Sequence, residues 1–114
     1  MLNNNPHPYI FDAKTQCWMR PDYASIDYSD GNETEERIKS IVEACVDRSV
    51  LSDELRSQCV DWPTAYHLSG TRSNILRPFS EALAGARVLE IGAGCGAITR
   101  FLGEAGADVL ALEG

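Results

Sequence analysis

Residues 85–96 decide the fold, and they read Gly85-Ala86-Arg87-Val88-Leu89-Glu90-Ile91-Gly92-Ala93-Gly94-Cys95-Gly96. Residues 86–91 form a short apolar run that is partly β-branched, which is typical of a strand buried in a parallel sheet. The run leads directly into glycines at alternate positions, and bulky side chains are poorly tolerated in a turn of this kind. The sequence therefore predicts a buried strand followed by a tight glycine-rich turn.

A helix and a second strand are expected after this turn. Residues 97–105 place Ile98, Phe101 and Leu102 on one face of a helix, and residues 107–112 form another short apolar run. Residues 85–114 therefore predict a β-α-β unit, and the expected fold class is α/β.

A strand, a glycine-rich turn and a helix in this order favour a nucleotide site. Glycines let the backbone approach a ligand closely, and the helix N-terminus offers unpaired N–H groups. Gly92, Gly94 and Ala97 satisfy the dinucleotide pattern G-x-G-x-x-G/A, whereas Glu90 with the three glycines satisfies E-x-G-x-G-x-G. Because the Glu90 carboxylate would repel a pyrophosphate, it favours a cationic ligand.

This motif resembles that of the class I S-adenosylmethionine-dependent methyltransferases, whose first motif is acidic-x-Gly-x-Gly-x-Gly. Glu90, Gly92, Gly94 and Gly96 match it position by position. The resemblance implies a Rossmann-like fold, S-adenosyl-L-methionine as the cofactor, Glu90 facing the amino-acid end of that cofactor, and close approach at the three glycines.

The resemblance also implies an acidic residue at the end of the second strand. Glu113 stands there, 21 positions after Gly92. The two oxygens of such a carboxylate match the two hydroxyl donors of a ribose, so Glu113 is the expected ribose-binding acid.

The residues before the β-α-β unit show a weaker likeness. Residues 62–69 and 71–78 look like the segment ahead of the methyltransferase domain in large bacterial proteins that pair methyltransferase with glycosyltransferase modules for surface-polysaccharide synthesis. The acceptor implied is a saccharide or a lipid-linked glycan. Tyr66, His67 and Arg72 are candidates for covering the cofactor, and the favoured alternative is that Tyr66 merely packs this segment onto the sheet while His67 hydrogen-bonds.

Residues 32–84 are expected to form a helical lead-in. From Glu33 to Arg48 the apolar residues recur at helical spacing, with Asn32 as the N-cap and Glu35 at the third position; they are Ile38, Ile41, Val42, Cys45 and Val46. A second helix is expected from Ser52, carrying Leu55 and Cys59. Residues 61–70 are expected to break the helical pattern, which resumes at 71–77 until Pro78 ends it.

Residues 1–31 are expected to form an extended, loosely structured arm. They are rich in Asn, Pro, Asp, Tyr and Ser without a sustained period. Scattered aromatics suggest that the arm docks on a surface, most simply on its own domain; they are Tyr9, Phe11, Trp18, Tyr23 and Tyr28.

Composition excludes several classes of protein. The chain has 114 residues, 44% of them hydrophobic, with a formal net charge of −7 and no basic run, which argues against nucleic-acid binding. No window approaches the roughly 20 apolar residues of a membrane span, and the N-terminus lacks a signal-peptide pattern, so a cytoplasmic protein is predicted. The spacing of the four cysteines is unlike that of a metal site.

The expected sheet is smaller than the seven-stranded sheet of the methyltransferase family. Two strands cannot bury both of their faces, so we expect either the N-terminal portion of a longer enzyme or a core completed by self-association. Methyl transfer by the chain alone is not expected, and neither titratable candidate near the site, His67 or Glu90, is assigned as a base. Two alternatives stay open: part of an NAD- or FAD-binding Rossmann enzyme, and a noncatalytic helical interaction module.

Overall fold

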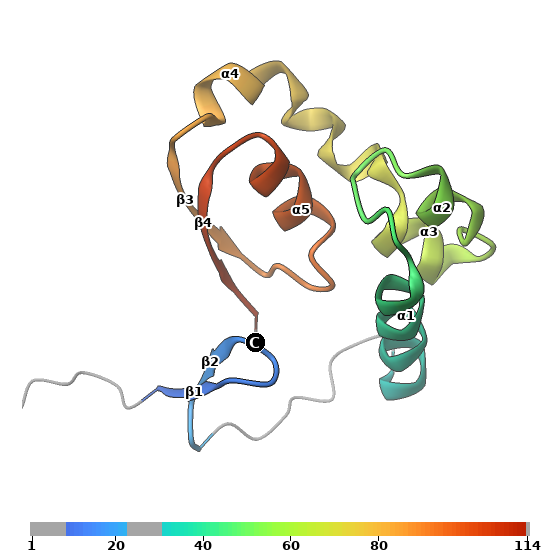
Figure 1. Ribbon diagram of the computed structural model, residues 1–114, viewed down its shortest axis with the longest axis horizontal. Coiled ribbons are helices and arrows are strands. Elements are labelled where there is room, and N and C mark those ends of the chain that lie inside the picture. Colours follow the sequence, from blue (N-terminus) through green and yellow to red (C-terminus); the bar gives the residue numbers. More distant parts are fainter. Residues whose placement is uncertain (1–8, 23–30, 114) are drawn as a thin grey trace, which may run out of the picture.

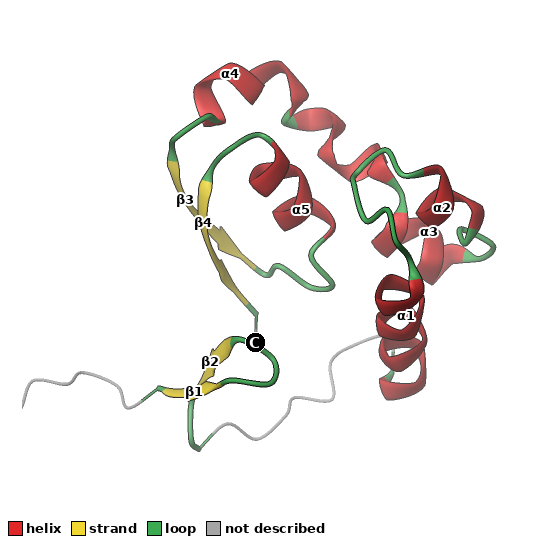
Figure 2. Cartoon of the chain, in the orientation of Figure 1, coloured by secondary structure: helices red, strands yellow, loops and turns green. Residues whose placement is uncertain are grey.

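The glycine-rich stretch folds as the connection within a parallel pair of strands. In the computed structural model, which describes residues 9–22 and 31–113, strand β3 (Arg87–Ile91) pairs with β4 (Asp108–Leu112), in register from Arg87 opposite Asp108 to Ile91 opposite Leu112. Helix α5 (Ala97–Glu104) connects them and buries Phe101. The predicted β-α-β unit is confirmed, and the described residues form a mixed α/β structure with two small sheets (Figures 1 and 2).

Within residues 9–22 and 31–113, only one face of the β3–β4 sheet is covered. Side chains alternate along a strand, and α5 lies against the face that carries Glu90, as its contact with Thr99 of α5 shows. The other face carries Arg87 and Asp108 at one end and four apolar residues that are 45–79% exposed, namely Leu89, Ile91, Leu110 and Leu112. We call these six residues the outer sheet face. The predicted burial of the strand is therefore seen on one side only, where helix α5 covers it.

The helical lead-in is observed, with more elements than the sequence indicated. It comprises α1 (Asn32–Ala44), α2 (Asp53–Ser57), α3 (Trp62–Leu68), the 3-10 helices η1 (Gly70–Ile75) and η2 (Arg77–Phe79), and α4 (Ser80–Leu83). Its core is built from residues of α1, α2 and α3 and the loop after α1, namely Ile38, Cys45, Leu55 and Leu68. Ile38, Cys45 and Leu55, which the sequence places among the apolar residues of two predicted helices, are buried in this core.

The two ends of α1 differ from the prediction. Asn32 lies inside the helix, and the N-cap is Gly31, whose φ of 97° suits glycine and which has no side chain to cap the helix. At the other end α1 stops at Ala44 rather than at Arg48, because the Arg48 guanidinium turns back and donates to the carbonyls of Glu43 and Cys45. Beyond that stop, Val46 is 94% exposed instead of lying on the buried face.

Helix α3 occupies the stretch that was expected to break the helical pattern. Asp61 accepts a hydrogen bond from the Thr64 backbone N–H at 3.0 Å, and the Thr64 hydroxyl accepts from the backbone N–H of Asp61 at 3.1 Å. This capping box starts the helix, and Pro63 lies in its first turn, where a missing N–H costs nothing. Pro78 lies in the same kind of position in η2, so the chain continues as a helix beyond it.

Part of the expected extended arm is a β-hairpin. Strands β1 (Ile10–Asp12) and β2 (Cys17–Met19) pair antiparallel, and the Phe11 and Trp18 rings face each other across them at 5.1 Å. Within the turn, the Asp12 carboxylate accepts bonds from the Thr15 hydroxyl and the Lys14 N–H, which also lower the pKa of Asp12. The arm prediction is wrong for residues 9–22. Tyr23 and Tyr28 lie outside the described residues.

Helix α5 is held from the lead-in as well as from the sheet. An Arg100 guanidinium N–H donates to the carbonyl of Leu68 at 3.2 Å, and the Glu104 carboxylate accepts the backbone N–H of Val50 at 2.7 Å. Figure 1 shows α5 between the strands and the lead-in helices. The two bonds hold the middle and the C-terminal end of α5 against the lead-in. No helix within residues 9–22 and 31–113 is both long enough and apolar enough to cross a bilayer.

Candidate functional site

The glycine loop, residues 92–96, adopts a backbone that L-residues avoid. Gly92, Gly94 and Gly96 have φ values of 74°, 57° and 80°, all in the left-handed region. The left-handed conformation of the backbone therefore requires glycine at each of these three positions. Gly96 is the N-cap of α5 and accepts the Arg100 N–H at 3.0 Å, which starts the helix.

The loop is tied to the end of the neighbouring strand. The N–H groups of Gly92 and Ala93 both donate to the carbonyl of Leu112, at 2.8 and 3.0 Å. Because Leu112 is the last residue of β4, these bonds bring the loop to the carboxyl edge of the sheet. Ligands of open α/β sheets bind outside this edge.

Glu113 follows β4 and lies directly against the glycine loop. Its carboxylate Oε2 accepts the backbone N–H of Gly94 at 2.5 Å, and the residue is exposed. Two of the predicted site residues, 19 positions apart in the sequence, are therefore in contact. Parallel pairing of β3 and β4 causes this meeting, since it places the ends of both strands at one edge.

Glu90 lies on the α5 side of β3, one residue before the strand ends. Its carboxylate Oε2 accepts the Thr99 hydroxyl at 2.6 Å, so it joins the strand to the first turn of α5. A carboxylate near a helix N-terminus is stabilised by the positive end of the helix dipole. Thr99 was not singled out in the sequence, although its place three residues after the last glycine puts it on the first helical turn.

The space in front of the loop is open. A Cβ added at Gly92 or Gly94 would meet no atom within 4 Å. The loop therefore offers a bare backbone surface, with two carboxylates nearby, to a ligand that carries positive charge and hydroxyl donors.

Tyr66 belongs to a cluster at the junction of α3 and η1. The Arg72 guanidinium lies over its ring at 4.1 Å, and the His67 ring meets it edge-on at 5.0 Å. The cation–π partner of Tyr66 is thus a residue of the same chain. These contacts lie within the lead-in, so they bear out neither the predicted packing of Tyr66 onto the sheet nor a contact with a sulfonium.

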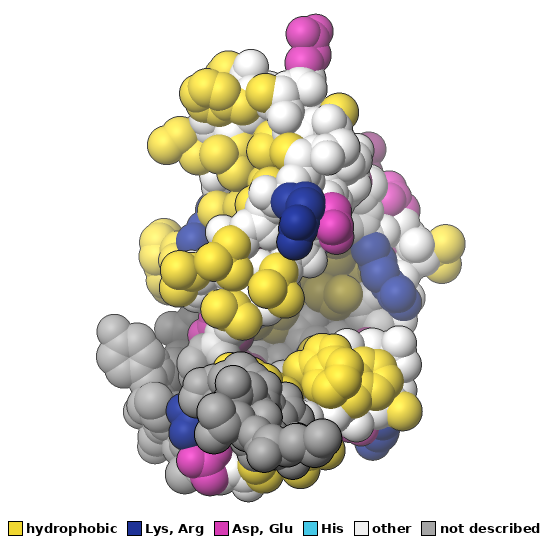
Figure 3. All heavy atoms as spheres, turned by 90° about the vertical axis from the view of Figure 1, so that its left-hand side faces the viewer, with side chains coloured by type: hydrophobic (Ala, Val, Ile, Leu, Met, Phe, Trp, Pro, Cys, Tyr) yellow, Lys and Arg dark blue, Asp and Glu magenta, His cyan; other side chains and the backbone are white. Residues whose placement is uncertain are grey.

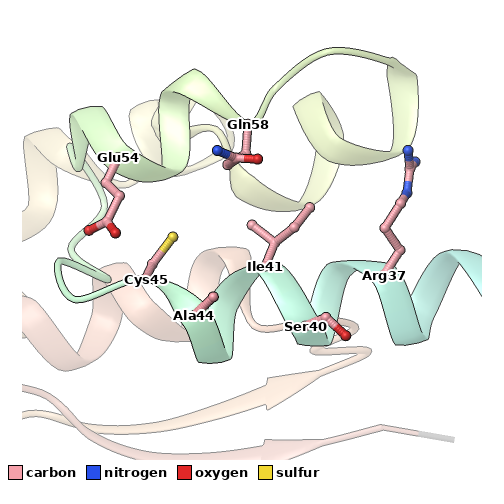
Figure 4. Close-up of a pocket in the computed structure, with 7 residues that line it drawn as sticks. All are labelled: Arg37, Ser40, Ile41, Ala44, Cys45, Glu54 and Gln58. Atoms are coloured by element: carbon pink, nitrogen blue, oxygen red, sulfur yellow. The ribbon is translucent and has the colours of Figure 1, made fainter.

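A concave region lies between α1 and α2. It measures about 340 Å³ and is lined by Arg37, Ser40, Ile41, Ala44, Cys45, Glu54 and Gln58 (Figure 4). Its charged groups already have structural partners, because Arg37 pairs with Asp61 and Glu54 accepts the N–H groups of the loop after α1. Burial, followed by the nearby Glu54, raises the pKa of the Cys45 thiol, so this thiol is not activated.

Comparison with known proteins adds no relative: no family model, no curated protein and no solved structure matches the chain.

Proposed function

We propose that the chain supplies the glycine-loop part of an S-adenosylmethionine site in a methyltransferase with a Rossmann-like fold. The observation that carries the proposal is the contact between Gly94 and Glu113, at the carboxyl edge of a parallel strand pair. This contact brings the acid expected to bind ribose next to the glycine loop. The match of Glu90 and the glycines to the methyltransferase motif supports the same assignment.

Each residue in this proposal has a role that follows from its chemistry. Because Gly92, Gly94 and Gly96 carry no side chains, the ligand can lie directly against the backbone of the loop. Glu113 accepts hydrogen bonds from the ribose hydroxyls, as a carboxylate with two oxygens can accept from two neighbouring donors. Glu90 contributes negative charge on the side of the ammonium group, while its bond to Thr99 fixes its orientation.

When bound, S-adenosylmethionine would supply an electrophilic methyl group on its sulfonium. The contribution of this chain would be binding and orientation, which account for most of the rate gain in a displacement of this kind. We propose a saccharide or lipid-linked glycan as the acceptor class, on the likeness of residues 62–78 alone. No residue is assigned as a general base.

The test is ligand-observed NMR with S-adenosylhomocysteine, the product form of the cofactor, and separately with NAD. We expect saturation transfer to S-adenosylhomocysteine from the wild-type chain. Gly94→Asp should abolish it, because a side chain there fills the open space in front of the loop. Glu113→Gln should weaken it by about tenfold, the usual cost of losing a hydrogen bond to a charged group.

Glu81→Gln is the matched control for Glu113→Gln. It removes the same negative charge, but from an exposed residue of α4. It should leave the signal unchanged. Saturable binding of NAD alone would overturn the methyltransferase assignment in favour of a dinucleotide enzyme. Equal binding by wild-type and Gly94→Asp would show that the ligand site lies elsewhere.

A further inference from the structure

The hairpin of β1 and β2 carries large apolar side chains that the described residues leave exposed. Its strands pair with each other in a sheet that is separate from that of β3 and β4. The rings of Phe11 and Trp18 are 44% and 67% exposed, and Ile10 and Met19 on the opposite face are exposed as well. Because a hairpin with strands of three residues is only marginally stable alone, it gains stability from a surface that these side chains cover.

The hairpin is shaped by bonds among its own residues. Gln16, in the turn, has a left-handed backbone with φ 59°, and its side-chain amide donates to the carbonyl of Ala13 at 2.8 Å. Just after β2, Arg20 forms an ion pair with Asp22 at 2.7 Å. Together with the bonds that Asp12 accepts, these contacts close the turn and brace the end of β2. The hairpin therefore presents its two aromatic rings as one unit.

The hairpin lies off the carboxyl edge of the β3–β4 sheet. Figure 1 shows it next to the end of β4, and Figure 3, turned by 90°, again shows hydrophobic side chains below those of the sheet, where the hairpin faces the viewer. The same edge carries the glycine loop and Glu113. In a larger sheet, further strands would lie beside β3 or β4 and further helices would cover its faces, including the outer sheet face. The carboxyl edge would remain the side where ligands bind.

The proposed cofactor directs its adenine towards the hairpin. Its amino-acid part, ribose and adenine follow one another in this order, and Glu90 and Glu113 are assigned to the first two. The adenine therefore continues past the end of β4, where the hairpin lies. Residues 90–96 and Glu113 offer no aromatic side chain to this flat base. An exposed aromatic ring stacks favourably on a base, and the hairpin carries two such rings.

We propose that the β1–β2 hairpin covers the cofactor site and that the Trp18 ring stacks on the adenine. Trp18 is the more exposed ring of the aromatic pair, and Phe11, its register partner on β1, supports it at 5.1 Å. This inference rests on the proposed function. It assigns the binding of the base to a part of the chain that precedes the methyltransferase motif and does not resemble it.

The experiment is a ligand-observed NMR titration with S-adenosylhomocysteine and with S-ribosylhomocysteine, which has the same amino-acid and ribose parts but no adenine. Trp18→Leu keeps an apolar side chain but removes the ring. It should weaken the binding of S-adenosylhomocysteine by about tenfold and leave that of S-ribosylhomocysteine unchanged. Trp18→Phe keeps a ring and should retain most of the affinity. Trp62→Leu is the matched control, because it removes the other tryptophan, which is 72% exposed on α3.

Fluorescence gives a second readout. In Trp62→Leu the only tryptophan is Trp18, and its emission should be quenched by S-adenosylhomocysteine but not by S-ribosylhomocysteine.

The outcomes separate this inference from the proposed function. If Trp18→Leu binds S-adenosylhomocysteine as the wild type does while Gly94→Asp abolishes binding, the role of the hairpin is overturned and the proposed function stands. Equal weakening of both ligands by Trp18→Leu also overturns the stacking, since Trp18 would then act through the fold and not on the adenine. A wild-type chain that binds neither ligand overturns the proposed function and the role of the hairpin together.

Discussion

Replacing Gly96 with alanine is expected to destabilise the chain, whereas the same replacement at Gly103 is expected to stabilise it. Gly96 has a left-handed backbone, with φ 80° and ψ 22°, and an L-residue in that conformation costs about 1–2 kcal/mol. Gly103 lies within α5 with open space where its Cβ would stand, and alanine recovers about 0.5–1 kcal/mol there. The two variants should therefore differ by about 2 kcal/mol in free energy of unfolding.

Urea unfolding followed by circular dichroism measures this difference. The only atoms near a Cβ at Gly96 belong to Thr99, the nearest at 3.8 Å, so steric crowding is not the cause of the expected loss. Gly96→Asn should recover part of it, because asparagine tolerates the left-handed region better than alanine does. A Gly96→Ala variant as stable as the wild type would contradict the left-handed conformation of residue 96.

Four further variants test the packing and the helix capping of the lead-in. Gly70→Ala should destabilise the chain by about 1–3 kcal/mol, because its Cβ would lie 2.6 Å from the carbonyl oxygen of Val50; the same urea titration measures the loss. Ile38→Ala, in the core, should cost about 2–5 kcal/mol by that titration, whereas Val46→Ala, at a residue that is 94% exposed, should change stability by less than about 0.5 kcal/mol. Hydrogen bonds from the Thr64 hydroxyl and N–H and from the Arg37 guanidinium lower the pKa of Asp61 to about 2. The ionised Asp61 carboxylate therefore stabilises the fold fully above about pH 4, and this stabilisation is lost as the pH falls towards 2. Urea midpoints between pH 2 and 6 should therefore fall less steeply for Asp61→Asn than for the wild type.

The β-α-β unit could be predicted closely because its signals are local. The apolar run before Gly92, the alternate glycines and the helical spacing of Phe101 and Leu102 each specify one element, and the structure contains all of them. The contact between Gly94 and Glu113 follows from parallel pairing, which the resemblance implied. The apolar runs alone do not tell whether one face or both faces of a strand are buried, because they look the same in either case.

The lead-in was harder to predict because its helices start and end through side-chain bonds to the backbone. Asp61 and Thr64 start α3 within residues 61–70, where the sequence predicts a break in the helical pattern. Arg48 ends α1 early by binding its last carbonyls, which leaves Val46 exposed in spite of its helical spacing. The hairpin over residues 9–22 is too short for a strand period to stand out from the surrounding polar residues.

The backbone amide of Gly94 gives the most direct test of the proposed cofactor site. This N–H donates to Glu113, so a ribose that binds the same carboxylate must change its surroundings. In an isotopically labelled chain titrated with S-adenosylhomocysteine, we predict a saturable shift of the Gly94 resonance together with those of Gly92 and Gly96, while Gly103 stays in place. A glycine loop whose resonances do not move at millimolar ligand, or that move no more than Gly103, would contradict the assignment.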